Sequence, residues 1–378
     1  MAVVSDYLYR KAALNKIPLS GCFELSPVCN FACKMCYVRK TAAQIAAEGK
    51  RVRTWREWLA LAQDCRQAGT LYLLLTGGEP FLYPDFKKLY LALHELAFVI
   101  SINSNGTMID EETVKWLKKA APSRINITLY GASRETYGRI CGNPDGYDRA
   151  VHAILLLKQA GIPVVINASM IPENAGDMQA IIAFGKKHDI NTRVSTYMFP
   201  PVRREREQTD SRFSPEIAAQ MCMHKYQWQM SEEAFRSNMT RQLASLNAVD
   251  GDDTDNWGNQ ADHDEYMRCR AGRSSFWVSW DGTMSACGML PFPMTVYPFE
   301  QPFLPCWEKL TDRVRTTPVL KECAGCAKKE ICNPCVAMLY AETGDINQKA
   351  PYLCRMTDCM IEEMTQALDA LEGKQNAQ

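Results

Sequence analysis

The feature that most restricts the fold of this chain is an alternation of short β-rich runs with amphipathic helical stretches, from Gly21 to about residue 200. The expected strands are 22–25, 71–76, 97–103, 124–130, 164–169 and 192–197. The helical stretches that follow them include 55–67, 84–96, 111–120, 147–160 and 175–187. Six βα units in succession indicate a parallel sheet. We predict an α/β fold, a partial (β/α)6 TIM-like barrel with its site at the C-terminal ends of the strands.

The sequence predicts four segments along the chain. Residues 1–20 form an N-terminal extension, residues 21–200 the barrel, residues 201–265 a bridging segment, and residues 266–378 a small cysteine-rich domain. Pro200 and Pro201, followed by a charged run, are typical of a connection between domains. Within the bridge, 215–248 reads as helical and 249–265 as an acidic loop. In the last region we expect little regular periodicity apart from a strand pair at 276–280 and 283–286, and little apolar core.

The composition excludes several classes of function. Of the 378 residues, 47% are hydrophobic and 23% charged, and 43 basic residues balance 43 acidic ones, which is typical of a folded protein without a nucleic-acid or anionic-membrane partner. We find no apolar run of the roughly 18 residues that a spanning helix needs and no signal peptide, so we expect a cytoplasmic protein. Because cytosolic cysteines stay reduced, the 16 cysteines indicate metal binding rather than disulfides.

Three cysteines lie directly after the first expected strand. Cys29, Cys33 and Cys36 have the spacing C-x3-C-x2-C, which lets one loop wrap a 4Fe-4S cluster with three thiolates. The fourth iron then stays open for a substrate or cofactor. A zinc site or a chance arrangement is the alternative.

A Gly-Gly-Glu-Pro turn follows the second expected strand at Gly77, Gly78, Glu79 and Pro80. Its backbone can approach a charged amino acid closely. Together with the cysteine triplet, this turn resembles the radical S-adenosylmethionine (radical SAM) superfamily over residues 21 to about 200. The resemblance implies that SAM chelates the open iron, that the turn and Glu79 hold the SAM amino group, and that one electron cleaves SAM to a 5′-deoxyadenosyl radical.

The same resemblance implies further SAM contacts. By the family pattern, Asn105 and Thr128 lie where the ribose is bound, and Arg139 lies near the SAM carboxylate. Asn105 could equally be a turn residue beside Gly106. The family usually has an aromatic residue just before the third cysteine; this chain has Met35 there and Tyr37 two positions on, so adenine packing shifts to Tyr37.

Seven more cysteines follow in the C-terminal region: Cys269, Cys287, Cys323, Cys326, Cys332, Cys335 and Cys354. Two C-x2-C pairs would also suit a zinc ribbon, and spacing alone does not decide the metal. The order resembles the SPASM extension of radical SAM enzymes, which carries auxiliary iron-sulfur clusters. One departure is that two residues, not three, separate the last two cysteines of the C-x2-C array.

The SPASM resemblance implies two auxiliary clusters, both expected as 4Fe-4S. Cys323, Cys326, Cys332 and Cys354 would hold the distal cluster, and Cys269, Cys287 and Cys335 the proximal one. The proximal cluster lacks one ligand, and we consider His263, an open iron or the substrate. The other cysteines, at positions 22, 65, 141, 222, 306 and 359, are expected to act as small hydrophobes.

These features predict a radical SAM oxidoreductase that modifies a peptide or protein side chain by crosslinking, epimerisation or dehydrogenation, as in ribosomal peptide maturation. Flavodoxin or ferredoxin is the expected electron donor. A dehydrogenase of a small molecule is the alternative, followed by a non-catalytic iron-sulfur or zinc protein. A sulfatase maturase would need an acidic residue after Cys287, where this chain has Gly288. The short N-terminal extension leaves no room for a leader-binding domain, so leader recognition would fall to a separate protein or to the bridge.

Overall fold

A computed structural model describes residues 2–201, 211–247, 267, 269–290 and 295–376. The barrel strands are β1 (Ser20–Glu24), β2 (Tyr72–Thr76), β3 (Val99–Ser104), β4 (Arg124–Thr128), β5 (Val164–Ser169) and β6 (Thr192–Ser195). They pair in parallel in the order β6-β5-β4-β3-β2-β1. The predicted parallel sheet of a partial barrel is therefore confirmed.

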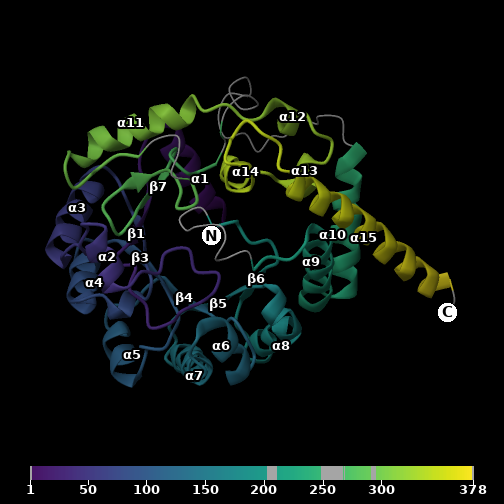
Figure 1. Ribbon diagram of the computed structural model, residues 1–378, viewed down its shortest axis with the longest axis horizontal. Coiled ribbons are helices and arrows are strands. Elements are labelled where there is room, and N and C mark those ends of the chain that lie inside the picture. The colour runs from purple at the N-terminus through teal and green to yellow at the C-terminus, as the bar shows by residue number, and fades with distance from the viewer. Residues whose placement is uncertain (1, 202–210, 248–266, 268, 291–294, 377–378) are drawn as a thin grey trace.

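Helices cover the outer side of this curved sheet (Figure 1). They are α3 (Trp55–Gln67), α4 (Phe86–Glu95), α5 (Glu111–Leu117), α6 (Arg134–Cys141), α7 (Gly146–Gln159) and α8 (Met178–Lys187). Short connecting helices are α2 (Ala42–Ala47), η1 (Pro80–Leu82) and η2 (Pro172–Asp177), and α1 (Ala2–Leu14) precedes β1. The sequence pattern did not predict α1, α2 or α6.

Alternating side chains explain why these strands form a barrel. Ile100 and Ile102 of β3, and Ile125 and Ile127 of β4, are at most 2% exposed in the main apolar core. Successive side chains of a strand point to opposite faces, so the residues between them lie on the inner face. These are polar, and Asn126 Nδ2 donates to Asn103 Oδ1 at 2.7 Å. At β3 and β4 the barrel thus has an apolar outer layer and polar side chains on its inner face.

A hairpin from the C-terminal region extends this sheet, which the sequence analysis did not predict. β7 (Ser275–Val278) pairs in parallel with β1, and β8 (Met284–Ser285) pairs antiparallel with β7. Gly21 permits the contact, because a Cβ there would lie 2.5 Å from the Phe276 ring. The expected strand pair is present, but its first strand is part of the barrel sheet.

The C-terminal region has more apolar core than we expected. Its helices are α11 (Phe303–Arg315), α12 (Lys321–Ala324), α13 (Lys329–Cys332), α14 (Val336–Thr343) and α15 (Pro351–Asn376). Trp307 and Leu310 of α11 are fully buried in the same core as the barrel strands. The expectation of little apolar core is wrong here, because the amphipathic α11 packs against α3.

The bridge is helical where it was predicted to be. It contains α9 (Pro215–Gln229), α10 (Glu232–Ala244) and η4 (Ser245–Asn247), and Figure 1 shows α9 and α10 beside α15. The acidic stretch 249–265 lies outside the described residues. Among the helices that the structure describes, none is long and apolar enough to cross a membrane.

Candidate active site and cluster-binding groups

The three-cysteine loop lies between the end of β1 and the end of α6. Ala32 N donates to Cys141 O at 2.8 Å and Lys34 N donates to Ile140 O at 3.1 Å. These bonds fix the loop at the C-terminal ends of the barrel strands, where parallel α/β proteins place their sites.

The thiols of this loop lie within electrostatic reach of one another. Burial raises the pKa of Cys29 to about 12, and the charges of Cys33 and Cys36 contribute. A hydrogen bond with the Cys141 side chain, together with burial, raises the pKa of Cys33. Backbone N–H groups already face two of the sulfurs, from Phe31 to Cys29 at 3.4 Å and from Arg39 to Cys36 at 3.3 Å.

The double glycine of the Gly-Gly-Glu-Pro turn allows two loops to touch. A Cβ on Gly77 would lie 2.4 Å from Ser26 O, and one on Gly78 would lie 2.3 Å from Val28 O. Gly78 N donates to Ser26 O at 2.7 Å and Glu79 N to Val28 O at 3.0 Å. The turn after β2 therefore pairs with the segment that leads into the cysteine loop, and larger residues would separate the two.

Glu79 is a buried acid that joins this turn to the turn after β3. It is 1% exposed, and its carboxylate accepts from Phe81 N at 3.1 Å, Ser104 Oγ at 2.9 Å and Asn105 N at 2.8 Å. Burial raises the pKa of Glu79 to about 7, although the three hydrogen bonds oppose this shift. Protein donors thus occupy both of its oxygens.

Asn105 extends the network to the cysteine loop. Its Nδ2 donates to Asn30 Oδ1 at 2.8 Å and lies 3.7 Å from Cys29 Sγ. Asn105 Oδ1 accepts from Thr107 N at 2.9 Å and from Thr107 Oγ1 at 2.6 Å. The structure therefore brings Glu79, Asn105 and Cys29 into one hydrogen-bonded chain.

Four other expected SAM contacts lie in or around the same loop. Thr128 ends β4, and its carbonyl accepts from the Tyr137 hydroxyl at 3.4 Å. Arg139 donates to Glu173 O at 2.8 Å and is also bonded to Glu135 and Thr136. Tyr37 packs in a small cluster with Cys36 and Trp280. Pro80 is buried at the start of η1. Their contacts with SAM stay predictions.

The C-terminal cysteines form two groups in space. Burial raises the pKa of Cys323, as do the charges of Cys354, Cys332 and Cys326, so these four thiols lie near one another. Burial raises the pKa of Cys335 as well, with contributions from Cys269 and Cys287. The two groups have the same members as the expected distal and proximal sets. Their ligation of iron stays a prediction, and His263 lies outside the described residues.

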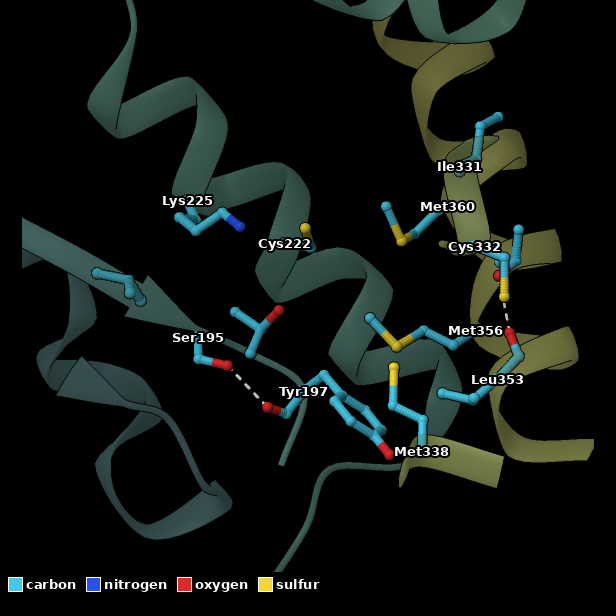
Figure 2. Close-up of a pocket in the computed structure, with 13 residues that line it drawn as sticks. Ser195, Tyr197, Cys222, Lys225, Ile331, Cys332, Met338, Leu353, Met356 and Met360 are labelled. Carbon is cyan, nitrogen blue, oxygen red and sulfur yellow. Dashed lines mark hydrogen bonds between the residues drawn. The ribbon is translucent and has the colours of Figure 1, made fainter. Parts of the chain in front are cut away.

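A pocket of about 250 Å³ adjoins the distal group (Figure 2). Cys332, Met338 and Met356 line one side, and Lys225 of α9 and Tyr197, which follows β6, line the other. The Tyr197 hydroxyl donates to Glu342 Oε1 at 2.9 Å, and the Glu342 side chain is 5% exposed. Burial and Glu342 raise the pKa of Tyr197, so its hydroxyl stays protonated.

The residue after Cys287 lies against an indole ring. A Cβ on Gly288 would lie 2.8 Å from the ring of Trp277. An acidic side chain could enter this position only if Trp277 moved. This contact gives a physical reason for the glycine at the position where a sulfatase maturase would have its base.

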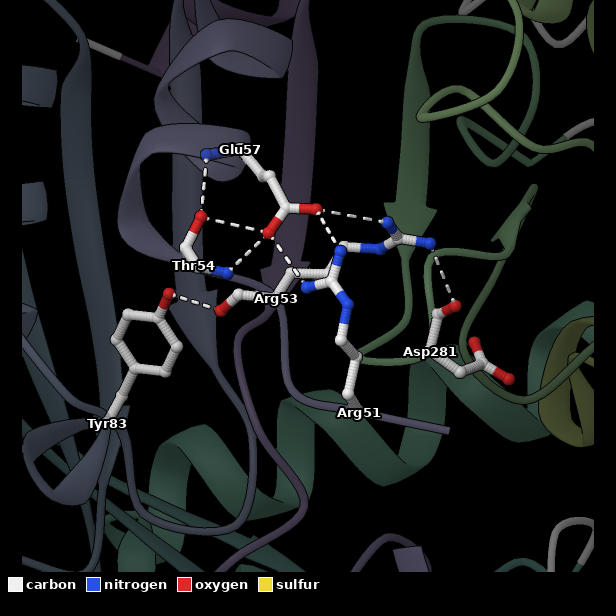
Figure 3. Close-up of polar contacts among 6 residues, drawn as sticks. All are labelled: Arg51, Arg53, Thr54, Glu57, Tyr83 and Asp281. Carbon is white, nitrogen blue, oxygen red and sulfur yellow. Dashed lines mark hydrogen bonds and ion pairs between the residues drawn. The ribbon is translucent and has the colours of Figure 1, made fainter. Parts of the chain in front are cut away.

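A polar network connects the hairpin to the segment after the cysteine loop (Figure 3). Arg53 Nη2 donates to Asp281 O at 3.3 Å, and its guanidinium lies 3.9 Å from the centre of the Phe299 ring. Glu57, which caps α3 through Thr54, lies 3.5 Å from Arg53 and 2.7 Å from Arg51. Arg53 therefore links α3 to the β7–β8 turn.

Two residues near the cysteine loop were missed by sequence reasoning. Burial raises the pKa of Tyr130, and the charges of Cys33 and Cys36 contribute, so its hydroxyl lies near these thiols. Cys141 is fully buried as expected, but it also contacts Cys33. The sequence did contain one indication of its role, because Tyr130 follows β4 at the C-terminal ends of the barrel strands.

The donor set at the three-cysteine loop fits a 4Fe-4S cluster. Cys29, Cys33 and Cys36 are free thiols close together, with backbone N–H groups directed at two of them. Within the described ranges, no three His, Cys, Asp or Glu side chains form a site for a single metal ion. A cubane cluster does not require three side chains around one ion, because each thiolate binds a different iron.

Comparison with known proteins agrees with this geometry. Residues 23–185 match the model of the Radical SAM superfamily. This part of the chain is a radical SAM domain. A cysteine-rich C-terminal region follows this domain, as the sequence motifs predicted.

Three relatives illustrate the range of the similarity. The chain is 26% identical to an AdoMet-dependent heme synthase of Methanosarcina barkeri, over 90% of this chain and 97% of the relative. It is 25% identical to the sporulation killing factor maturation protein SkfB of Bacillus subtilis, over 44% of this chain and 39% of the relative. Its fold resembles Streptococcus suis SuiB bound to the precursor peptide SuiA, with a TM-score of 0.64 and 17% identity, over 93% of this chain and 80% of SuiB.

Proposed function

We propose that this protein uses SAM to oxidise a side chain of a peptide or protein. One observation carries the proposal: the structure gathers seven C-terminal thiols into two groups, besides the three-cysteine loop at the barrel strand ends. A radical SAM enzyme that only abstracts hydrogen needs the loop alone. Additional clusters suit a reaction that must also remove an electron from the substrate.

The residues of the chain have separate roles in this proposal. Cys29, Cys33 and Cys36 would hold the SAM cluster, whose chemistry is to supply a 5′-deoxyadenosyl radical. Loss of a hydrogen atom leaves a carbon radical on the substrate, and loss of one further electron and one proton completes a two-electron oxidation. The C-terminal cysteines would hold the electron acceptors, and flavodoxin or ferredoxin would supply the first electron. SAM would be consumed at one per turnover.

The peptide assignment is supported by relatives that act on or bind peptides. SuiB is bound to a precursor peptide in a structure that shares this fold, and SkfB is a maturation protein. Similarity to SkfB covers 44% of this chain. The peptide substrate therefore belongs to the proposal.

A tetrapyrrole is the second candidate substrate. The heme synthase relative matches 90% of this chain and 97% of its own length. In this proposal, oxidation of a tetrapyrrole would use the same two thiol groups. The two candidates therefore differ in the substrate but not in the proposed roles of the cysteines.

The test separates the start of the reaction from its completion. In a folded Cys326→Ala variant, we expect 5′-deoxyadenosine release to persist while oxidised product disappears, because the three-cysteine loop alone starts the chemistry. Cys359→Ala is the matched control, since Cys359 is a buried cysteine outside both groups. Both variants are assayed with a candidate peptide and with a tetrapyrrole. Full product from Cys326→Ala would refute the electron-acceptor role.

A further inference from the structure

We propose that Asn105 is a positioning residue that donates an N–H···S hydrogen bond to Cys29 and so raises the reduction potential of the cluster at the three-cysteine loop. This inference rests on the proposed function, because it requires a cluster on that loop. It assigns Asn105 a role different from the ribose contact that the family resemblance implies.

The hydrogen bonds of Asn105 fix the orientation of its side chain. Thr107 donates twice to Asn105 Oδ1, from its backbone N at 2.9 Å and from its hydroxyl at 2.6 Å. The oxygen must therefore point toward Thr107, and Nδ2 must point toward the cysteine loop. One Nδ2 hydrogen binds Asn30 Oδ1 at 2.8 Å, and the other is directed at Cys29 Sγ, 3.7 Å away.

The backbone and the neighbours of Asn105 are also held by hydrogen bonds. The Asn105 N–H donates to the buried Glu79 at 2.8 Å. Asn30 Nδ2, on the cysteine loop, donates to Thr107 Oγ1 at 2.7 Å. Asn105 is 8% exposed. A ribose oxygen could bind Asn105 without breaking these bonds only by taking the Nδ2 hydrogen that is directed at Cys29 Sγ, so the two roles compete for this one hydrogen.

The Asn105 N–H should change the reduction potential of the cluster because reduction changes the charge of the cluster. One-electron reduction adds negative charge to the cluster and its thiolate sulfurs, and an N–H directed at a thiolate stabilises that charge. Removal of the donor should therefore make reduction harder. A hydrogen bond to a charged group corresponds to about a tenfold change in an equilibrium constant.

The experiment compares three variants of the full-length, anaerobically reconstituted protein. Asn105→Ser removes the amide without adding charge, and Asn105→Asp keeps the acceptor for Thr107 while removing the donor. Asn30→Asp is the charge-matched control, because it adds the same charge beside Cys29 but leaves the Asn105 amide in place. Dithionite supplies the electron, and the reduction potential is measured by an electron paramagnetic resonance (EPR) redox titration. The signal that changes when SAM is added is followed, because it identifies the cluster on the three-cysteine loop.

We expect Asn105→Ser to retain iron but show about a tenfold smaller reduced-to-oxidised ratio at a given potential, a shift of about 59 mV to more negative values. The reduction potential of Asn105→Asp should be more negative than that of Asn30→Asp. A wild-type potential in Asn105→Ser would overturn the inference, as would reduced SAM affinity without a shift, which would indicate the ribose contact. Loss of iron from the loop in both Asn105 variants would also overturn it and indicate a structural role. If instead the wild-type loop binds no iron, the proposed function itself fails.

Discussion

Glu79 shows how single residues in this site serve the fold and the chemistry together. Its carboxylate is buried and accepts three hydrogen bonds, and burial raises its pKa to about 7. The sequence predicted a partner for the SAM amino group. The structure adds that Glu79 holds the turns after β2 and β3 together, so its substitution would disturb Asn105 as well as SAM.

The raised pKa of Glu79 predicts a pH dependence of stability. An acid whose pKa is higher in the folded than in the unfolded state favours folding when protonated, so this contribution is present below pH 4.5 and falls as the pH rises through about 7. A shift of this size corresponds to roughly 3 kcal/mol. In metal-free protein, we expect the stability of wild type relative to Glu79→Gln to decrease from pH 5 to pH 8. Melting temperatures across this range provide the measurement, and a constant difference would contradict the prediction.

At the scale of elements, the β7–β8 hairpin connects the barrel to the cysteine-rich region. Parallel pairing with β1 and the contacts of Arg53 fix the hairpin beside the cysteine loop. The sequence predicted this strand pair from its turn residues. Its pairing with β1 could not be predicted, because the register depends on the contact between Gly21 and Phe276, which are far apart in the chain.

Arg53 and Arg51 offer a matched test of this connection. Both contact Glu57, but the Arg53 side chain is 18% exposed and the Arg51 side chain is 64% exposed. Arg53→Met should lower the free energy of unfolding by about 1–3 kcal/mol, because it also loses the Phe299 and Asp281 contacts. Arg51→Met should cost about 0–1 kcal/mol. Urea denaturation of both variants measures the difference, and equal losses would show that Arg53 does not hold the hairpin.

At the scale of the whole molecule, local patterns predicted the barrel well and the C-terminal region less well. The predicted range 164–169 coincides with β5, and 55–67 coincides with α3, because alternation and helical periodicity are local signals. The buried face of α11 was missed, since its partners lie in the barrel. The cysteine groups were predicted by resemblance, whereas the contact of Asn105 with Cys29 joins two loops and depends on the folded chain.

The complete set of thiol groups predicts the metal content. If ten of the 16 cysteines hold three 4Fe-4S clusters, anaerobically reconstituted protein should contain about 12 irons per chain. Replacement of Cys29, Cys33 and Cys36 by Ala should remove about four of them. Iron and zinc analysis checks both values. Zinc in place of iron in the C-terminal groups would refute the auxiliary clusters and leave the barrel site unaffected.

The most direct test of the central claim is cleavage of SAM by the reconstituted protein with dithionite, followed as 5′-deoxyadenosine by chromatography. We expect the nucleoside from wild type and from Cys65→Ala, which changes a buried cysteine outside the three groups, and none from Cys33→Ala. Wild-type protein that carries its full iron and releases no 5′-deoxyadenosine would contradict the account.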